Sequence, residues 1–269
     1  VLCGYRWLCD VSLALPGARF ITGRPSVTRI TVYYALLGAF YYVLWCGMRR
    51  RKKKADEEEF RLQTRMPAEK PKANQQSKSR TWMVIRRRLG FAMGIIVLMR
   101  ILFIRGGSGF ELNILDVGQG DGIYLCTSAG VSLMIDGGSS DTKNVGTYRI
   151  LPFLKSKAVR KVSYWFVSHT DEDHISGIAE VLESGYRVEH LVLAKAQKKD
   201  EKAIRLAEIA RQNGTAVCYM KAGERLHCGS DESTEVVKCL YPAENEVTAD
   251  VNDRCLVLLY QGQNFAGFF

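Results

Sequence analysis

The sequence predicts an α+β domain that is preceded by one or two transmembrane helices. From residue 110 onward, short runs of apolar and β-branched residues are separated by Gly-rich turns and alternate with helical patterns. This order is typical of a sheet covered by helices. Before residue 110, two apolar segments at 30–48 and 89–105 are bordered by arginine and lysine, as membrane spans commonly are.

The first apolar segment, residues 30–48, is predicted to cross a membrane at the end of a membrane region over 1–48. Thr31 is its only conventional polar side chain, and its tyrosines and tryptophan suit the interface. A buried core helix is the alternative. Six cations follow at 49–54. By the positive-inside rule they place the next segment, a basic charged linker over 49–88, in the cytoplasm.

The second apolar segment, residues 89–105, is short for a span and contains Arg100. This arginine would have to extend its charge toward an interface. The segment is predicted to span the membrane, with an interfacial helix as the alternative. If it spans, the triple arginine at 86–88 stays in the cytoplasm and residues 110–269 are delivered to the extracytoplasmic side.

The remaining elements follow from local patterns. Runs with β-branched residues that end at glycines predict strands, and an apolar face at helical spacing predicts helices. We expect strands at 110–116, 123–127, 131–136, 162–167, 189–194, 215–219, 235–241 and 255–260, and helices at 145–156, 175–184 and 196–213.

The net charge of +10 is unevenly distributed. Residues 1–109 carry 21 Lys/Arg against 6 Asp/Glu, whereas residues 110–269 carry 17 against 22. The second part is therefore mildly acidic, which does not fit a basic domain that wraps a nucleic-acid backbone. If it meets a polyanion, metal ions or another part of the protein must supply the attraction.

The eight cysteines form no C-x-x-C pair, and most lie in apolar runs. A free buried thiol is the usual state of such a cysteine. The chain starts at Val1 without a signal-peptide pattern and stops inside an apolar run. We therefore expect both ends to be cuts through a longer protein.

Residues 168–177 are the most informative stretch of the sequence. They hold His169, Asp171, Asp173 and His174 directly after an apolar run, in a chain with only 4 histidines. Neutral imidazole and carboxylate are ligands that zinc and manganese accept. The spacing favours a metal site, and two metals about 3.5–4 Å apart would suit phosphodiester hydrolysis. The alternative is a polar loop in which Asp173 or Ser168 caps the following helix.

Three further motifs offer polar groups to the same site. Asp136 ends a predicted strand and is followed by two glycines, where ordinary turn chemistry is the alternative. Asp116, Gln119 and Asp121 belong to the segment DVGQGD, whose glycines allow a tight bend; a hairpin turn with solvated acids is the alternative. Asn252 precedes the last predicted strand. His190 and His227 stand outside any cluster and are predicted to be surface or structural histidines.

Together these motifs resemble the metallo-β-lactamase superfamily. The stretch 168–177 is similar to its ligand loop HxHxDH, with Asp171 where the second histidine normally stands. With DVGQGD at 116–121, IDGG at 135–138 and DVND at 250–253, residues 110–269 resemble the C-terminal domain of ComEC-type DNA-internalisation proteins of natural competence. Residues 30–48 are similar to the end of that family's membrane region.

The resemblance implies an αββα sandwich, C-terminally incomplete, with a site for two divalent ions, zinc or manganese. It implies His169, Asp171, Asp173 and His174 as metal ligands. Asp173 would also orient the attacking water or accept its proton, and Asp136 would steady the ligand histidines. Asp116, Gln119, Asp121 and Asn252 would lie beside the ligands or face the substrate.

The implied function is DNA uptake through a bacterial plasma membrane, with an extracytoplasmic hydrolase domain that acts on DNA phosphodiesters. The implied partners are DNA, as a single strand or incoming duplex, membrane lipid and other competence proteins. The alternatives are a membrane-tethered metallo-hydrolase of another ester or phosphodiester, and a module that binds DNA without cutting it. The family continues with a bridging Asp after the position of Phe269, so the resemblance implies an incomplete, weakly active site in this fragment.

Overall fold

A computed structural model describes residues 2–14, 21, 23–64, 86, 89–98, 100, 109–229, 235–243, 254–263 and 265–269. The chain divides into two compact units. One comprises residues 25–105, and the other comprises residues 1–24 together with 106–269. The second unit contains the predicted α+β domain and, at its start, helix α1 (Leu2–Ala14), which the sequence patterns did not predict.

The unit over residues 25–105 is built on one long helix, α2 (Val27–Thr64), of 38 residues. Its part Val27–Glu57 is long and apolar enough to cross a membrane, and no residue of its apolar window is buried. The helix runs on through the cations at 49–54, so the predicted linker begins as helix. A shorter apolar helix covers Leu89–Leu98. Of the rest of the second predicted span, residues 99 and 101–105 lie outside the described residues.

The first sheet of the α+β domain has six strands in the order β1-β2-β3-β4-β5-β6. Strands β1 to β3 pair antiparallel as the predicted meander, whereas β3 to β6 run parallel. Parallel neighbours require crossover connections, and helices supply them here. The strands are β1 (Glu111–Ile114), β2 (Ile123–Cys126), β3 (Ser132–Ile135), β4 (Val162–Phe166), β5 (Val188–Ala194) and β6 (Ala216–Met220).

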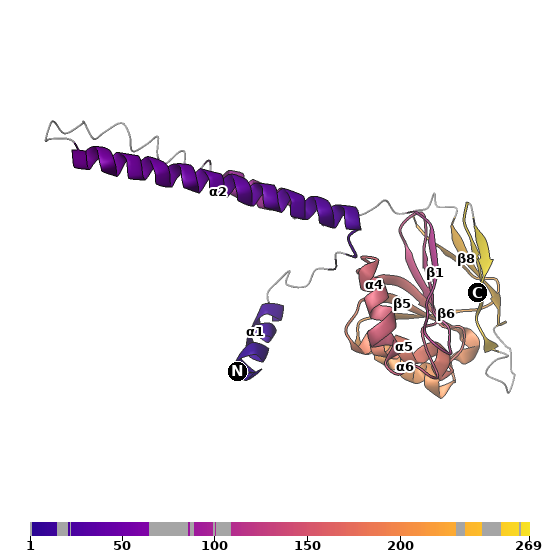
Figure 1. Cartoon of the computed structure of the whole chain (residues 1–269). Coiled ribbons are helices and arrows are strands. Elements are labelled where there is room, and N and C mark those ends of the chain that lie inside the picture. Colours follow the sequence, from indigo (N-terminus) through magenta and orange to yellow (C-terminus); the bar gives the residue numbers. More distant parts are fainter. Residues whose placement is uncertain are drawn as a thin grey trace. The chain divides into compact units, whose positions relative to one another are not determined.

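The second sheet has four antiparallel strands in the order β10-β9-β8-β7. They are β7 (Arg225–His227), β8 (Val236–Tyr241), β9 (Val257–Gln261) and β10 (Ala266–Phe268). In Figure 1 these yellow and orange strands lie on the side of the first sheet that faces away from α4 and α5. The short β7 and β10 were not predicted, because three residues are too few to show an alternating pattern.

The helices pack on one face of the first sheet. They are a π-helical turn η1 (Gly146–Ile150) that continues as α4 (Leu151–Ser156), then α5 (Glu172–Glu183), a 3₁₀ turn η2 (Lys195–Gln197) and α6 (Glu201–Gln212). The predicted helix at 196–213 therefore starts too early. Asp200 ends the turn and caps α6, since its side chain accepts a hydrogen bond from the Lys202 amide.

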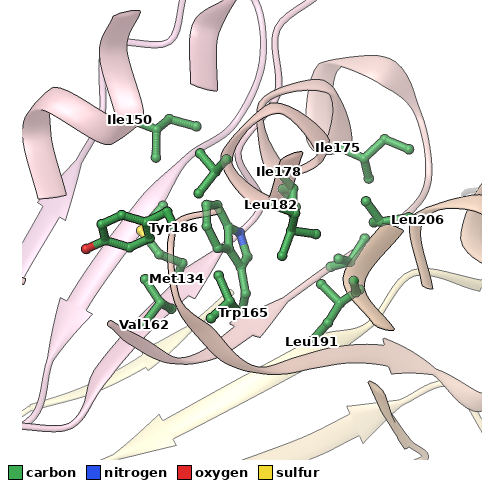
Figure 2. Close-up of a cluster of buried hydrophobic side chains, with 14 of the residues drawn as sticks. Met134, Ile150, Val162, Trp165, Ile175, Ile178, Leu182, Tyr186, Leu191 and Leu206 are labelled. Carbon is green, nitrogen blue, oxygen red and sulfur yellow. The ribbon is translucent and has the colours of Figure 1, made fainter. Parts of the chain in front are cut away.

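Two apolar clusters fill the two spaces between layers. The cluster between the helices and the first sheet is centred on the buried Trp165 and includes Ile178, Leu182 and Met134 (Figure 2). The second cluster joins the two sheets and includes Phe166 from the first sheet and Tyr260 from the second. The described residues thus form three layers, helices, sheet and sheet, of the predicted sandwich.

A buried carboxylate also ties the two sheets together. Glu235, just before β8, accepts hydrogen bonds from the Ser128 and Ala129 amides in the β2–β3 turn and from the Tyr260 hydroxyl. Burial alone would raise the pKa of Glu235, but these hydrogen bonds outweigh it and hold the pKa below its usual value.

All eight cysteines have free thiols. Cys228 and Cys239 are buried between the sheets, and burial raises their pKa values to about 12 and about 11. The expectation of buried thiols is wrong for Cys3 and Cys218, which are exposed.

Candidate metal centre

The predicted ligand loop lies where β4 ends and α5 begins, at the edge reached by the carboxyl ends of the parallel strands. The side chain of the N-cap residue, Asp171, makes no capping hydrogen bond. Neither Asp173, in the first turn of α5, nor Ser168 caps the helix. The capping explanation for these polar residues is therefore wrong, and their side chains are available for another purpose.

Asp136 links both ends of the ligand loop. It follows β3, is only 4% exposed and has a backbone φ of 53°. Its Oδ1 accepts a hydrogen bond from the Ser168 amide at 2.8 Å, and its Oδ2 accepts one from the Ser168 hydroxyl at 2.6 Å. The same Oδ2 lies 2.9 Å from Nδ1 of His174. A carboxylate on one imidazole nitrogen fixes the ring and leaves Nε2 for a metal.

Among the described residues, His169, Asp173 and His174 form a group that could hold a metal ion. Their ligand atoms all lie within 4.8 Å of one another. The two imidazole rings are 3.7 Å apart between centroids. Zinc takes nitrogen and oxygen ligands at about 2.0–2.2 Å, so small side-chain shifts bring all three atoms to one ion. The donor set therefore fits a divalent metal.

The two histidines differ in their electrostatic surroundings. Burial alone would lower the pKa of His174, but the hydrogen bond to Asp136 and the nearby carboxylates raise it above its usual value. Burial and the neighbouring His174 lower the pKa of His169. A metal cation bound between the two imidazole rings would offset the negative charge of the carboxylates around them.

Asp171 is shared between the ligand loop and α6. Its Oδ1 accepts a hydrogen bond from Nζ of Lys202 at 3.1 Å, while its Oδ2 lies 3.7 Å from Nε2 of His169. Asp171 is therefore adjacent to the group that could hold a metal but is neutralised by a lysine.

The segment DVGQGD packs against the start of α5 because of its glycines. A Cβ on Gly120 would stand 2.5 Å from the Asp173 carbonyl oxygen, and one on Gly138, in the neighbouring segment IDGG, would stand 2.5 Å from the Asp173 carbonyl carbon. This approach brings Asp121 to the site, with its Oδ2 3.8 Å from Nε2 of His174.

The other predicted residues are not gathered at the site. Asp116 is 89% exposed and forms an ion pair with Arg149 at 2.9 Å. Gln119 is exposed, and its backbone amide donates to Asp141. Asn252 lies outside the described residues. His190 stacks on Tyr164 and His227 is exposed on β7, in agreement with structural or surface roles.

Three residues that hold the loop were not predicted. Gln197 is 1% exposed, and its side-chain amide donates to the Ser168 carbonyl at 2.8 Å. The buried Thr170 donates its hydroxyl to Asp200. Only the burial of a polar side chain identifies such residues, and a single sequence does not show it.

A mixed sheet with helices on one face, a second sheet on the other and a His/Asp loop at its edge define a metallo-β-lactamase fold. The profile of the metallo-beta-lactamase superfamily matches residues 115–201. The fold predicted from sequence is confirmed.

The chain is also a distant homologue of one named protein, ComE operon protein 3 of Bacillus subtilis (strain 168). The two are 30% identical over 147 residues, which are 48% of this chain and 18% of that protein. This chain thus spans less than a fifth of its relative.

Solved structures with this fold are more distant. The metallo-beta-lactamase fold protein YhfI from Bacillus subtilis is 13% identical, with 55% of this chain and 53% of that chain covered and a TM-score of 0.39. A metallo-beta-lactamase from Cronobacter sakazakii is 16% identical, with 59% of each chain covered and a TM-score of 0.35.

Proposed function

We propose that the chain is part of a bacterial DNA-uptake protein whose metallo-β-lactamase-fold domain hydrolyses DNA phosphodiesters with divalent metal ions. The observation that carries the hydrolase proposal is the convergence of His169, Asp173 and His174 within 4.8 Å, with Asp136 behind them. The distant homology to ComE operon protein 3 supports the DNA-uptake context.

The metal would be held by His169, Asp173 and His174. We propose two ions, zinc or manganese, because Asp171 and Asp121 offer further oxygens beside His169 and His174, at 3.7 and 3.8 Å. A bound divalent ion lowers the pKa of water and stabilises negative charge that develops on a phosphodiester oxygen.

Side chains of the protein orient the ligands and accept the proton in the proposed reaction. Asp136 keeps Nε2 of His174 directed away from the protein interior through its contact with Nδ1. Asp173, whose side chain is 37% exposed, has a carboxylate that can accept a proton from a water molecule in the site. Ser168 and Gln197 hold the loop backbone so that these groups keep their positions.

The proposed location is the plasma membrane, with residues 110–269 on the extracytoplasmic side. The apolar helix within α2 and the cations that follow it support a cytoplasmic position for residues 49–88. The second proposed span, at 89–105, would return the chain to the extracytoplasmic side. The proposed partners are incoming DNA, membrane lipid and other competence proteins.

The test measures metal binding and DNA cleavage on the purified chain in detergent. We expect binding of Mn²⁺ or Zn²⁺ and metal-dependent cleavage of labelled single-stranded DNA. Both should be lost in His169→Ala and His174→Ala, whereas His227→Ala, on the exposed β7, is the matched control.

Equal cleavage by the unmodified chain and the His169→Ala variant would contradict the proposal. Metal and DNA binding without cleavage would favour a non-catalytic DNA-binding module. Cleavage of small phosphodiesters or esters but not of DNA would favour a membrane-tethered hydrolase of another substrate.

A further inference from the structure

The surface around the candidate metal centre is divided by charge. On the His174 side it presents the exposed carboxylate of Asp121. On the His169 side the segment 195–202, between β5 and the first turn of α6, carries four lysines against two acids. This lysine segment is a local exception in a domain whose overall charge is negative.

The lysine segment is attached directly to the ligand loop. Gln197 donates to the Ser168 carbonyl at 2.8 Å, and Thr170 donates to Asp200. Nζ of Lys202 contacts Asp171 at 3.1 Å. The backbone that carries these lysines is therefore attached to the ligand loop by two partly buried hydrogen bonds, although the lysine side chains themselves are at the surface.

The four lysines differ in what they contact. Lys195 forms an ion pair with Glu224 at 3.1 Å. Nζ of Lys198 lies 4.8 Å from the centre of the Tyr219 ring, so it contacts a ring face. Lys198, Lys199 and Lys202 are all exposed. All three ammonium groups lie at the surface beside the metal centre, and that of Lys202 is also paired with Asp171.

We propose that Lys198, Lys199 and Lys202 bind the phosphates of a DNA strand and direct it past His169 into the metal centre. The inference rests on the proposed function, since it assigns the surface that receives the same substrate. Ammonium groups bind phosphates through charge, without reading bases. The carboxylate of Asp121 on the His174 side repels the phosphate backbone, so the strand lies on the lysine side.

The test measures binding separately from cleavage. Fluorescence anisotropy of a labelled single-stranded oligonucleotide is recorded with the whole chain in EDTA, over a series of salt concentrations. Each phosphate contact adds about 0.7 to the slope of log affinity against log salt for single strands. We expect the Lys198→Gln/Lys199→Gln double variant to lower this slope by about 1.4, and Lys202→Gln by about 0.7.

The matched control is the Lys155→Gln/Arg211→Gln double variant, which removes the same charge. Both residues are exposed in the last turns of α4 and α6, which lead to the starts of β4 and β6 at the opposite edge of the sheet. We expect this control to bind DNA as the unmodified chain does.

Equal slopes for the lysine variants, the control and the unmodified chain would overturn the inference, as would failure of the unmodified chain to bind the oligonucleotide. The two proposals fail in different ways. If the lysine variants bind and cleave DNA as the unmodified chain does, only the proposed role of the lysines is contradicted. If those variants bind DNA more weakly but the unmodified chain does not cleave DNA, only the proposed hydrolase activity is contradicted.

Discussion

The indole nitrogen of Trp165 donates a hydrogen bond to the backbone carbonyl of Asp136 at 3.0 Å. This contact joins the centre of the helix-facing core to the carboxylate residue that holds the ligand loop. The position of Asp136 therefore depends on apolar packing as well as on its polar partners.

Replacing Trp165 by Phe should destabilise the attachment of Asp136 to the apolar core. The variant loses the hydrogen bond to Asp136 and leaves a cavity, at a cost of about 1–3 kcal/mol. Hydrogen exchange measured by mass spectrometry should show faster exchange of β3 and β4 amides. Tyr148→Phe, at a residue that is 71% exposed, is the control; equal exchange in both variants would contradict the prediction.

Replacing Asp136 by Asn should weaken metal binding by about 10–100-fold, since the partner that orients a ligand histidine is changed. Asn tolerates the positive φ at this position, so the backbone is expected to be kept. Calorimetric titration with Zn²⁺ measures the effect. Asp116→Asn removes a charge from a residue that is 89% exposed and should bind metal normally. Unchanged affinity in Asp136→Asn would show that Asp136 does not act through His174.

Replacing Gly138 by Ala should destabilise the domain by at least about 2 kcal/mol, because the packing at this glycine is too close for a side chain. The new methyl group would stand 2.5 Å from backbone atoms of Glu172, Asp173 and His174. Urea denaturation followed by circular dichroism measures the loss. Gly109→Ala, where nothing lies within 4 Å, should be neutral. A Gly138→Ala variant as stable as this control would refute the close approach.

The free energy of unfolding should fall as the pH is lowered, because the carboxylate of Glu235 becomes protonated. Its folded pKa is depressed, so its contribution is fully present above its ordinary value of 4.5 and is lost as pH falls through the folded pKa. The free energy of unfolding of Glu235→Gln should therefore differ most from that of the unmodified chain at neutral pH and converge with it in acid. Glu208→Gln, at an exposed position on α6, should show no such convergence.

The membrane orientation can be tested with reporter fusions. Alkaline phosphatase, which is active only outside the cytoplasm, should be inactive when fused after residue 55 and active when fused after residue 109. The charge run at 49–54 provides the reason for the first expectation. An active reporter at residue 55 would show that the orientation is the reverse of the predicted one. An inactive reporter at residue 109 would contradict the prediction that residues 89–105 span the membrane.

Much of this structure follows from local sequence pattern. The meander, the strand before the ligand loop and the group His169, Asp173 and His174 could all be predicted, because each depends on residues close together in the chain. Asp136 was placed at the site through family resemblance, and the structure adds its contact with His174.

The remaining features depend on contacts between distant segments. Asp116 and Asp121 belong to one motif, yet only Asp121 lies near His174, because the chain turns between them at Gly118 and Gly120. The ion pair between Lys202 and Asp171 joins residues 31 positions apart. No spacing rule in a single sequence predicts such pairings, which are set by how α6 packs beside α5.

The double attachment of Asp136 to Ser168 and His174 closes the segment 168–174 into a ring before any ion arrives. The entropy of ordering these ligands is thus lost during folding of the domain rather than during metal capture. Chelation should then empty the centre without melting the sandwich, and an added ion should restore it without a refolding step. The metal would behave as an exchangeable reagent of the domain, unlike the ion of a zinc finger, whose removal unfolds the chain.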